Sequence, residues 1–577
     1  MNSIPRTGPA LRLPAARAYW VMALLLAAFV VLEGRDIYLQ GPRSRFLRNQ
    51  GSARYSRIIE IPAHRGMILD RNGHPLAIST PVKSVWASPA DFRASPDQMA
   101  QLSRLLGLPS ADIASRLADR ALDFVYLKRL MPPQDAQQVA ALRIPGVFLQ
   151  REYRRYYPTG DVAAQLIGFT DVDDKGQEGL ELAYQDWLAG KPGSRRVIKD
   201  RLGHIVQDVE NITAPRKGHD LTLSIDRDIQ YLAFRALQNA VVASRAESGS
   251  LIVLNAKTGE VLALANLPSF NPNNRDKAAP ADTRNRAVTD AAELGSVMKP
   301  FTIAAALQAG VITPNTQFQT APGVMSLDGW TISDAERNGL LTVAQVLQVS
   351  SNIGAAKIAL RLTPKQQWTM LHAVGFGQIP DTGFPGETAG DMRPYAAWRP
   401  IDQATIAHGN GISASLLQLA RAYTVFADGG VLMPLSFVKV DSPVQGRRVM
   451  SRTVANDVRR MLELVVEPGG TAPDARIPGY TVAGKTGTAH KVRRDGGYAR
   501  NRYIASFVGM APASDPRLIV AVALNQPSAG HYYGGEVAAP VFAQVMAASL
   551  RRLDVPPDAP STQAAPPAAA QPAKEAT

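Results

Sequence analysis

The sequence contains no cysteine among its 577 residues, which excludes disulfides, thiolate zinc sites and a cysteine nucleophile. Its eight histidines are dispersed, and none forms the His-x-x-x-His pair typical of a catalytic metal site. We therefore expect neither a metal ion nor a cofactor, and catalysis would have to use oxygen and nitrogen nucleophiles and bases.

Acidic residues are fewer than basic ones, and the net charge of +14 often indicates a nucleic-acid partner. However, the sequence has no RNA- or DNA-binding signature and no concentrated basic stripe. The scattered arginines fit a solvated surface, so we expect no nucleic acid to bind. A chain of this length is too long for one core, which predicts two or more domains.

One long apolar run lies near the N-terminus, from Ala18 to Leu32, after a stretch with three arginines and no acidic residue. Fifteen residues are short of the ~20 that span a bilayer, but Arg17 and Arg35 can extend to the interface. We predict a cytoplasmic tail over 1–17 and a single transmembrane signal-anchor over 18–39. The protein would then lie in the inner membrane with its remainder periplasmic. The alternative is a cleaved signal peptide.

Residues 40–217 are predicted to form a non-catalytic module outside the membrane. An Asn72-Gly73 turn between apolar segments predicts a β-hairpin. Leucine-rich spacing predicts helices over 98–106 and 135–142. No nucleophile and base pair up in this region, so Arg65, Asp70 and Glu181 are interpreted as a structural polar network.

Residues 218–553 are predicted to form the catalytic domain. Alternating apolar residues predict strands over 221–225 and 480–489, and apolar or strand-like runs predict strands over 250–254, 260–264, 503–510 and 517–524. Helices are predicted over 228–242 and 416–426. Late strands in succession favour an antiparallel sheet with helices packed against it, which is an α+β fold. Residues 554–577 are rich in proline and alanine, which predicts a disordered tail.

Ser296 and Lys299 lie three positions apart at the start of an apolar, alanine-rich segment that favours a helix. Residues i and i+3 of a helix share one face, so the two side chains can meet. A serine hydroxyl becomes a good nucleophile when a neighbour takes its proton, and a neutral lysine can do so. Burial or a second cation favours that neutral form.

Three other segments match parts of the same pattern without the right context. Ser436 and Lys439 lie on an alternating, strand-like segment, where positions i and i+3 point to opposite faces. Lys257-Thr258-Gly259 lies at a predicted hairpin turn, and Ser269-x-Asn271 lies in a proline-rich loop. Both of these precede Ser296. We expect none of the three to be catalytic.

Three motifs occur in a fixed order: Ser296-x-x-Lys299, Ser350-x-Asn352 and Lys485-Thr486-Gly487-Thr488. Together they resemble the active-site motifs of penicillin-binding proteins and serine β-lactamases. With the N-terminal anchor and the module over 40–217, the chain resembles class B penicillin-binding proteins of the division type, the FtsI family. The resemblance implies an elongated N-terminal pedestal, or dimerisation, domain followed by a β-lactamase-like transpeptidase domain.

The chemistry of these residues suggests their roles. Ser296 would attack the carbonyl of a D-Ala-D-Ala bond while Lys299 takes its proton, and Ser350 would relay a proton to the leaving D-alanine. Asn352 would hold Lys299 and the substrate amide. Lys485 would supply the second cation that helps to keep Lys299 neutral.

The strand that carries Lys485 is expected to bind an extended stem peptide along its edge. Gly487 would allow the peptide to approach closely, and Thr486 and Thr488 would bind its terminal carboxylate. The resemblance implies an oxyanion hole made of the backbone N–H groups of Ser296 and Thr488. It also implies that an amine of a neighbouring stem resolves the acyl-enzyme.

The resemblance further implies β-lactams as covalent inhibitors, and a polymerase and other division-complex membrane proteins as partners during septal wall synthesis. Two alternatives remain open: a D,D-carboxypeptidase or β-lactam hydrolase on the same fold, and a catalytically silent division scaffold. A fused glycosyltransferase is disfavoured because residues 40–217 lack the acidic motif of that family. His408 and Asn410 stand where the family more often has an aromatic residue, and His490 is expected to have a surface role.

Overall fold

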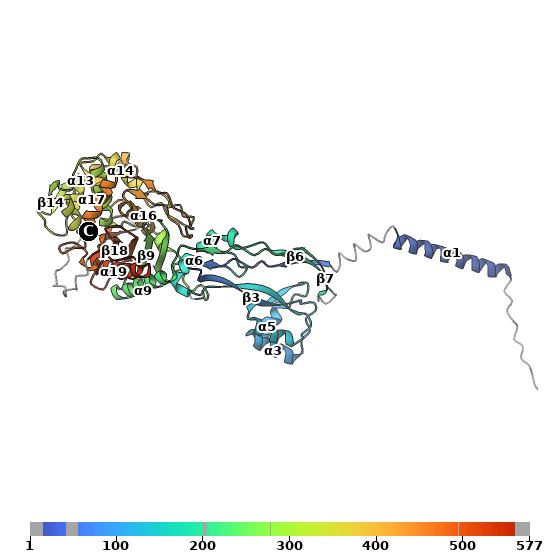
Figure 1. Cartoon of the computed structure of the whole chain (residues 1–577). Coiled ribbons are helices and arrows are strands. Elements are labelled where there is room, and N and C mark those ends of the chain that lie inside the picture. The colour runs from blue at the N-terminus through green and yellow to red at the C-terminus, as the bar shows by residue number, and fades with distance from the viewer. Residues whose placement is uncertain (1–14, 42–55, 200–204, 277, 494–495, 560–577) are drawn as a thin grey trace, which may run out of the picture. The chain divides into compact units, whose positions relative to one another are not determined.

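The protein is described by a computed structural model, which covers residues 15–41, 56–199, 205–276, 278–493 and 496–559 (Figure 1). It divides into two compact units. The first comprises Met1–Ala63, Pro81–Glu152 and Lys191–Arg216; the second comprises His64–Thr80, Tyr153–Gly190 and Lys217–Thr577. The boundaries predicted at 40–217 and 218–553 stay predictions. The compact units divide the chain differently: segments 64–80 and 153–190 belong to the same unit as the residues predicted to be catalytic.

The apolar N-terminal segment forms one helix, α1 (Ala15–Gln40). Its mean hydropathy of 2.0 over an 18-residue window and its 26 residues make it long and apolar enough to cross a membrane. It is the one such helix among the described residues. The predicted helix over 18–39 is therefore present and slightly longer than predicted, whereas residues 1–14 of the predicted cytoplasmic tail lie outside the described residues.

The first unit contains a three-stranded antiparallel sheet and a small helical cluster. The sheet has the order β1 (Ser56–Ile61), β6 (Gly193–Lys199) and β7 (Ile205–Thr213). The helices α3 (Pro96–Leu106), α4 (Ser110–Arg116) and α5 (Pro133–Ala141) pack with β4 (Val125–Met131) around a buried core that includes Leu102, Leu106 and Leu127. The helices predicted over 98–106 and 135–142 are confirmed.

The second unit contains the predicted hairpin, in which β2 (Ile68–Leu69) pairs with the start of β3 (Pro75–Ala87). Asp70 holds its turn, because Oδ1 accepts hydrogen bonds from the backbone N–H groups of Asn72 (2.9 Å) and His74 (2.7 Å). The prediction that Asp70 joins Arg65 and Glu181 in one network is therefore wrong. An Asp two residues before its N–H partner satisfies a local turn in preference to a distant cation.

The remaining two predicted residues do form a buried network. Arg65 Nη2 lies 2.7 Å from Glu181 Oε2, and Arg155 Nε lies 2.6 Å from Glu181 Oε1. All three side chains are at most 1% exposed. The sequence analysis missed Arg155, which supplies the second of the two guanidinium groups on this carboxylate.

The core of the second unit is a five-stranded antiparallel sheet. Its order is β10 (Val261–Leu267), β9 (Ser248–Asn255), β19 (Leu518–Asn525), β18 (Tyr498–Ala511) and β17 (Ala483–Val492). The strands predicted over 250–254, 260–264, 480–489, 503–510 and 517–524 are all present. β17 lies at one edge, so one side of its backbone is free of a strand partner.

Helices cover both faces of this sheet. Leu251 and Val253 of β9 pack with α9 (Arg227–Ser244) and α19 (Ala539–Arg552). Ile252 and Leu254 belong to the core shared with α11 (Lys299–Gln308) and α16 (Leu416–Ala427). Alternate residues of one strand point to opposite faces, which explains why the whole strand is apolar. The α+β prediction is confirmed.

Shorter elements complete the described chain. They are β5 (Val147–Tyr156), η1 (Gly160–Ala163), α6 (Ala164–Ile167), α7 (Gly179–Ala183), α8 (Gln185–Leu188), β8 (Leu221–Thr222), α10 (Arg286–Thr289), η2 (Gly295–Met298), β11 (Gln317–Gln319), β12 (Val324–Leu327), β13 (Trp330–Ser333), β14 (Leu340–Thr342), α12 (Val343–Gln348), α13 (Asn352–Ala359), α14 (Pro364–Ala373), η3 (Tyr395–Ala397), α15 (Pro400–Ile406), β15 (Val431–Leu432), β16 (Arg447–Arg448), α17 (Arg452–Glu463), η4 (Pro473–Ala475) and α18 (Gly534–Val537).

Several boundaries differ from the predictions: β17 begins at Ala483, three residues later than predicted, and β18 begins at Tyr498, five residues earlier. The strand predicted over 221–225 covers only Leu221–Thr222, and the next residue, Leu223, forms an isolated bridge with Val438. The tail was predicted to begin at 554, which is wrong for residues 554–559. Val555 is buried, and the Asp558 carboxylate accepts hydrogen bonds from the backbone and hydroxyl of Thr481. Residues 560–577 lie outside the described residues.

Candidate active site

Ser296 lies in the 3₁₀ turn η2, and α11 follows directly at Lys299. In a 3₁₀ helix residues i and i+3 stand almost in line, so this turn aligns the serine with the lysine. Ser296 is 1% exposed, and its Oγ has no hydrogen-bond partner among the described residues. The hydroxyl is therefore buried without any bond that would restrain its proton.

Close backbone packing fixes this turn beside β17. Gly295 has a φ of +67°, and a Cβ there would lie 2.9 Å from the Thr488 carbonyl oxygen. Glycine is thus required both by conformation and by space. On the other side, the hydroxyl of Tyr423 in α16 donates to the Val297 carbonyl at 2.8 Å. Burial raises the pKa of Tyr423 well above its usual value, so the phenol stays a donor.

Ser350 connects α12 to α13 and adopts a left-handed conformation with a φ of 58°. The next residue begins α13, because Ser351 Oγ accepts the Gly354 N–H at 2.9 Å. Asp334 supports the same helix end by accepting from Ser351 Oγ (2.6 Å) and from the Ile353 N–H (2.9 Å). Such a conformation is uncommon for serine and persists where the surroundings hold it in place.

The three predicted motifs meet at the hydroxyl of Ser350. Its Oγ accepts from Lys299 Nζ at 3.1 Å and from Lys485 Nζ at 2.9 Å. Lys299 Nζ also donates a short hydrogen bond to the Ser350 carbonyl. Both lysines are 0% exposed. Two buried amino groups thus share one hydroxyl, an arrangement that opposes full protonation of both.

Asn352 begins α13 but does not hold Lys299 as predicted. Its Nδ2 donates to the Ser333 carbonyl at 3.0 Å, and its Oδ1 has no hydrogen-bond partner among the described residues. The carbonyl and hydroxyl of Ser350 take the place that the prediction gave to Asn352. The carboxamide oxygen of Asn352 is therefore buried and unpaired within the described part of the chain.

Gly487 lies on β17 two residues after Lys485, and a Cβ there would lie 2.4 Å from both the Leu294 carbonyl oxygen and Ser506 Oγ. The missing side chain therefore makes room for the turn before Ser296. The close approach seen at Gly487 is internal, and the predicted approach of a peptide substrate to it stays a prediction.

The two threonines of the motif have buried partners. Thr486 Oγ1 lies 2.7 Å from Thr471 Oγ1 and 3.1 Å from Lys485 Nζ, and Thr488 Oγ1 accepts the Gly534 N–H at 3.0 Å. Both side chains are at most 1% exposed. The sequence analysis missed Thr471, which precedes the motif by more than a dozen residues and belongs to no recognisable pattern.

The three decoy motifs have structural roles. Ser436 Oγ donates to the Val438 carbonyl, while Lys439 Nζ donates to the Arg71 carbonyl, so these two side chains do not meet. Lys257 forms an ion pair with Asp515 at 2.7 Å, and Ser269 Oγ donates to the Asp161 carbonyl. Within the described ranges, no cluster of His, Asp and Glu side chains is placed to hold a metal ion.

A polar cluster that the sequence analysis missed adjoins the serine turn. The carboxylate of Glu293, three residues before Ser296, accepts from the Gly411 N–H (2.8 Å), the Tyr498 hydroxyl (3.0 Å) and Asn410 Nδ2 (3.4 Å). Burial raises the pKa of Glu293 above its usual value. The cluster links the turn, the loop after α15 and the start of β18.

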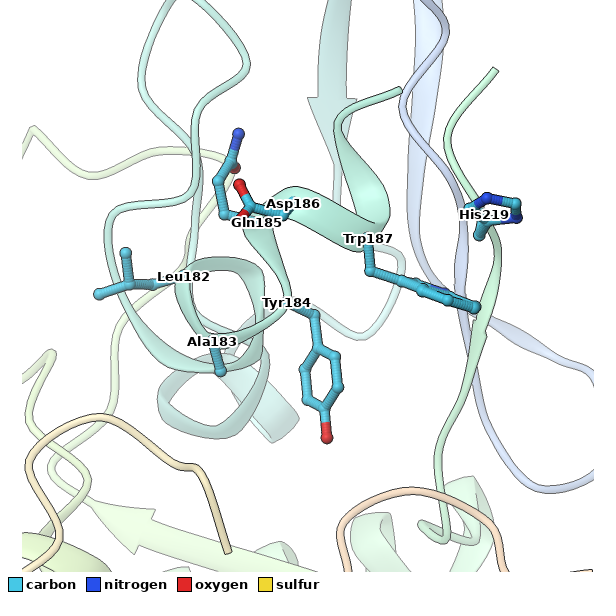
Figure 2. A pocket seen from close by; sticks show the side chains of 7 residues that line it. All are labelled: Leu182, Ala183, Tyr184, Gln185, Asp186, Trp187 and His219. Atoms are coloured by element: carbon cyan, nitrogen blue, oxygen red, sulfur yellow. The ribbon is translucent and has the colours of Figure 1, made fainter. Parts of the chain in front are cut away.

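A separate hollow of about 510 Å³ lies on the second unit (Figure 2). In this view the ring of Trp187 reaches toward His219, and the two ring centroids are 4.5 Å apart. The other lining residues are Leu182, Ala183, Tyr184, Gln185 and Asp186. None of the predicted catalytic residues lines this hollow.

Comparison with known families gives two matches. Residues 249–547 match the family described as penicillin binding protein transpeptidase domain, and residues 60–223 match the penicillin-binding protein dimerisation domain. The first match contains all eight residues predicted for the site.

Individual proteins resemble the chain over almost its full length. It is 44% identical to the probable peptidoglycan D,D-transpeptidase PbpC of Pseudomonas aeruginosa, covering 93% of this chain and 95% of that protein. It is 42% identical to the peptidoglycan D,D-transpeptidase FtsI of Escherichia coli K12, covering 94% and 93%. Penicillin-binding protein 3 of Mycobacterium tuberculosis, solved in complex with aztreonam, is 28% identical, with a TM-score of 0.68, covering 88% of this chain and 100% of that one.

Proposed function

Because this chain belongs to the family of penicillin-binding peptidoglycan D,D-transpeptidases, we propose that it cross-links peptidoglycan stem peptides through an acyl-enzyme on Ser296. One observation carries the assignment of the nucleophile. The unpartnered hydroxyl of Ser296 lies one 3₁₀ turn from Lys299, which shares the Ser350 hydroxyl with a second buried lysine.

Acylation begins when Ser296 Oγ attacks the carbonyl carbon of the terminal D-Ala-D-Ala bond. Lys299 takes the hydroxyl proton as the C–O bond forms. The buried ammonium of Lys485 favours the neutral, basic form of Lys299 beforehand. The negative charge that develops on the carbonyl oxygen is stabilised by the backbone N–H groups of Ser296 and Thr488.

Ser350 then carries the proton onward. Its hydroxyl contacts both amino groups, so it can accept a proton from Lys299 and donate its own to the nitrogen of the departing D-alanine. The C–N bond breaks, free D-alanine leaves, and the stem peptide remains as an ester on Ser296. The amine of a neighbouring stem attacks this ester, its proton returns to Ser296 Oγ through Lys299, and the cross-link is complete.

The edge strand β17 provides the binding site for the donor peptide. Its outer backbone side has no strand partner in the sheet, so an extended peptide can add to it. Thr486 and Thr488 bind the terminal carboxylate, and Asn352 Oδ1 accepts a peptide N–H. A β-lactam would acylate Ser296 in the same way, as the aztreonam complex of the mycobacterial relative suggests.

The cellular setting is proposed from the relatives and from α1. The helix would anchor the protein once in the inner membrane, with the chain after it periplasmic. Similarity to FtsI supports a role in septal wall synthesis. A glycan polymerase and other division-complex membrane proteins would be its partners.

Labelling with a fluorescent penicillin tests the nucleophile. Ser296→Ala should abolish covalent labelling, whereas Ser436→Ala, in the decoy motif, should label as the wild type does. The attached adduct should map to the peptide containing Ser296 in mass spectrometry of the labelled wild type. Labelling that persists in Ser296→Ala would move the nucleophile to another residue.

A further inference from the structure

His408 is a buried imidazole next to the catalytic turn, and the mechanism above does not use it. Its side chain is 8% exposed. The following residue, Gly409, has a φ of +93°, and a Cβ there would lie 2.2 Å from the Gly295 carbonyl oxygen. The loop of His408 is therefore packed directly against the residue that precedes Ser296.

The hydrogen bonds of Asn410 determine the tautomer of His408. Asn410 Nδ2 donates to Glu293 Oε2 and to the Tyr498 hydroxyl at 3.2 Å, so its Oδ1 faces His408 Nδ1 at 3.0 Å. An amide oxygen only accepts, so the imidazole must donate from Nδ1. Nε2 then carries a lone pair and no proton.

His408 stays neutral in this position. Burial, and after it the charge of Lys299, lower the pKa of His408 to about 3. Its Nε2 is buried and has no hydrogen-bond partner among the described residues. A bare acceptor of this kind, left unpaired in the resting enzyme, is costly unless another state of the enzyme uses it.

We propose that His408 is a positioning residue for Lys299, whose ammonium donates a hydrogen bond to Nε2 in the state that carries the proton of Ser296. This proposal rests on the proposed function, in which Lys299 gains and loses one proton per turnover. A neutral acceptor stabilises the ammonium through a charge-assisted bond. A carboxylate at position 408 would form an ion pair with the Lys299 ammonium and oppose transfer of its proton to Ser350.

A series of hydrogen bonds from Tyr498 through Glu293 to Asn410 orients the acceptor nitrogen, Nε2 of His408. The carboxylate gathers three donors from three segments, and one of them is the amide that fixes the imidazole. A histidine whose second nitrogen is oriented in this way presents a single tautomer to its partner. In this proposal the cluster orients His408, which in turn positions Lys299.

A matched pair of substitutions distinguishes the loss of the Nε2 acceptor from a loss of side-chain packing. His408→Asn keeps a donor where Nδ1 stands and removes Nε2, whereas His408→Gln places an amide oxygen near the position of Nε2. Stopped-flow acylation by a chromogenic cephalosporin gives the acylation rate constant and the dissociation constant of the initial complex separately. We expect His408→Asn to lower the rate constant about 10- to 100-fold, with the dissociation constant within about 2-fold of wild type.

His408→Gln should recover most of the rate, to within about 5-fold of wild type. Equal losses in the two variants, or a wild-type rate constant in His408→Asn, would overturn the proposal. Should His408→Asn not fold, Asn410→Leu serves instead, because it keeps His408 and removes the acceptor that fixes its tautomer. A wild-type rate in Asn410→Leu overturns the proposal equally. In every variant residual labelling should still require Ser296, so these outcomes are distinct from a failure of the proposed function.

Discussion

The proposed effect of the Lys485 charge on Lys299 can be tested through the pH dependence of the acylation rate. Both Nζ atoms lie within 3.1 Å of Ser350 Oγ, so the two amino groups are at most about 6 Å apart. Two unit charges at that distance repel by about 3 kcal/mol at an effective dielectric constant of 20. This repulsion favours the neutral form of Lys299 by about two pH units.

Lys485→Met removes the charge and keeps the length of the side chain. The sign of the effect follows from the repulsion. Without the second cation Lys299 holds its proton to higher pH, so the acid limb of the pH–rate profile should move up by about two pH units. The assay is the second-order acylation rate with a fluorescent penicillin between pH 5 and 10.

Lys257→Met is the matched control, because Lys257 belongs to the decoy Lys-Thr-Gly and pairs with Asp515 on the surface. Its profile should coincide with that of wild type. A profile of Lys485→Met that falls uniformly, with its acid limb unmoved, would refute the electrostatic reasoning. Lys485 would then act only through its hydrogen bonds to Ser350 and Thr486.

Two further predictions concern stability and packing. Burial raises the pKa of Asp174 to about 6, so the folded protein loses stability as pH rises from about 4 to 6. Asp174→Asn, which suits the φ of 62°, should raise the unfolding free energy at pH 7.5 by about 3 kcal/mol and flatten that pH dependence in denaturation curves. Gly487→Ala should lower the acylation rate at least ~10-fold by displacing the turn before Ser296, while Gly339→Ala, where a Cβ meets nothing within 4 Å, should leave it unchanged. Wild-type acylation by Gly487→Ala would show that the turn can shift without cost.

The sequence indicated which residues would come together at the candidate site because each motif is local. Ser296 and Lys299 are brought together by one turn of helix, and the apolar segment after them is enough to indicate that helix. A continuous apolar run likewise identified β9, since a strand buried on both faces is apolar throughout. These inferences need no information about distant segments.

Partners that come from distant segments could not be predicted. Arg155 joins Glu181 although its own segment contains several arginines, and no local pattern distinguishes it. Thr471 faces Thr486 from a loop without a motif. Asp70 was misplaced for a different reason: its carboxylate is occupied by its own turn and by the Arg227 N–H, and residue type alone does not show which acids already have partners.

The backbone conformation of Ser350 departs from the local preference of serine. A serine favours negative φ, and the left-handed conformation costs about 1–2 kcal/mol. In that conformation both the carbonyl and the hydroxyl of Ser350 face Lys299, so one residue replaces the bond expected from Asn352. The helix start held by Ser351 and Asp334 maintains it. The backbone conformation of this serine therefore brings two oxygens of one residue to Lys299.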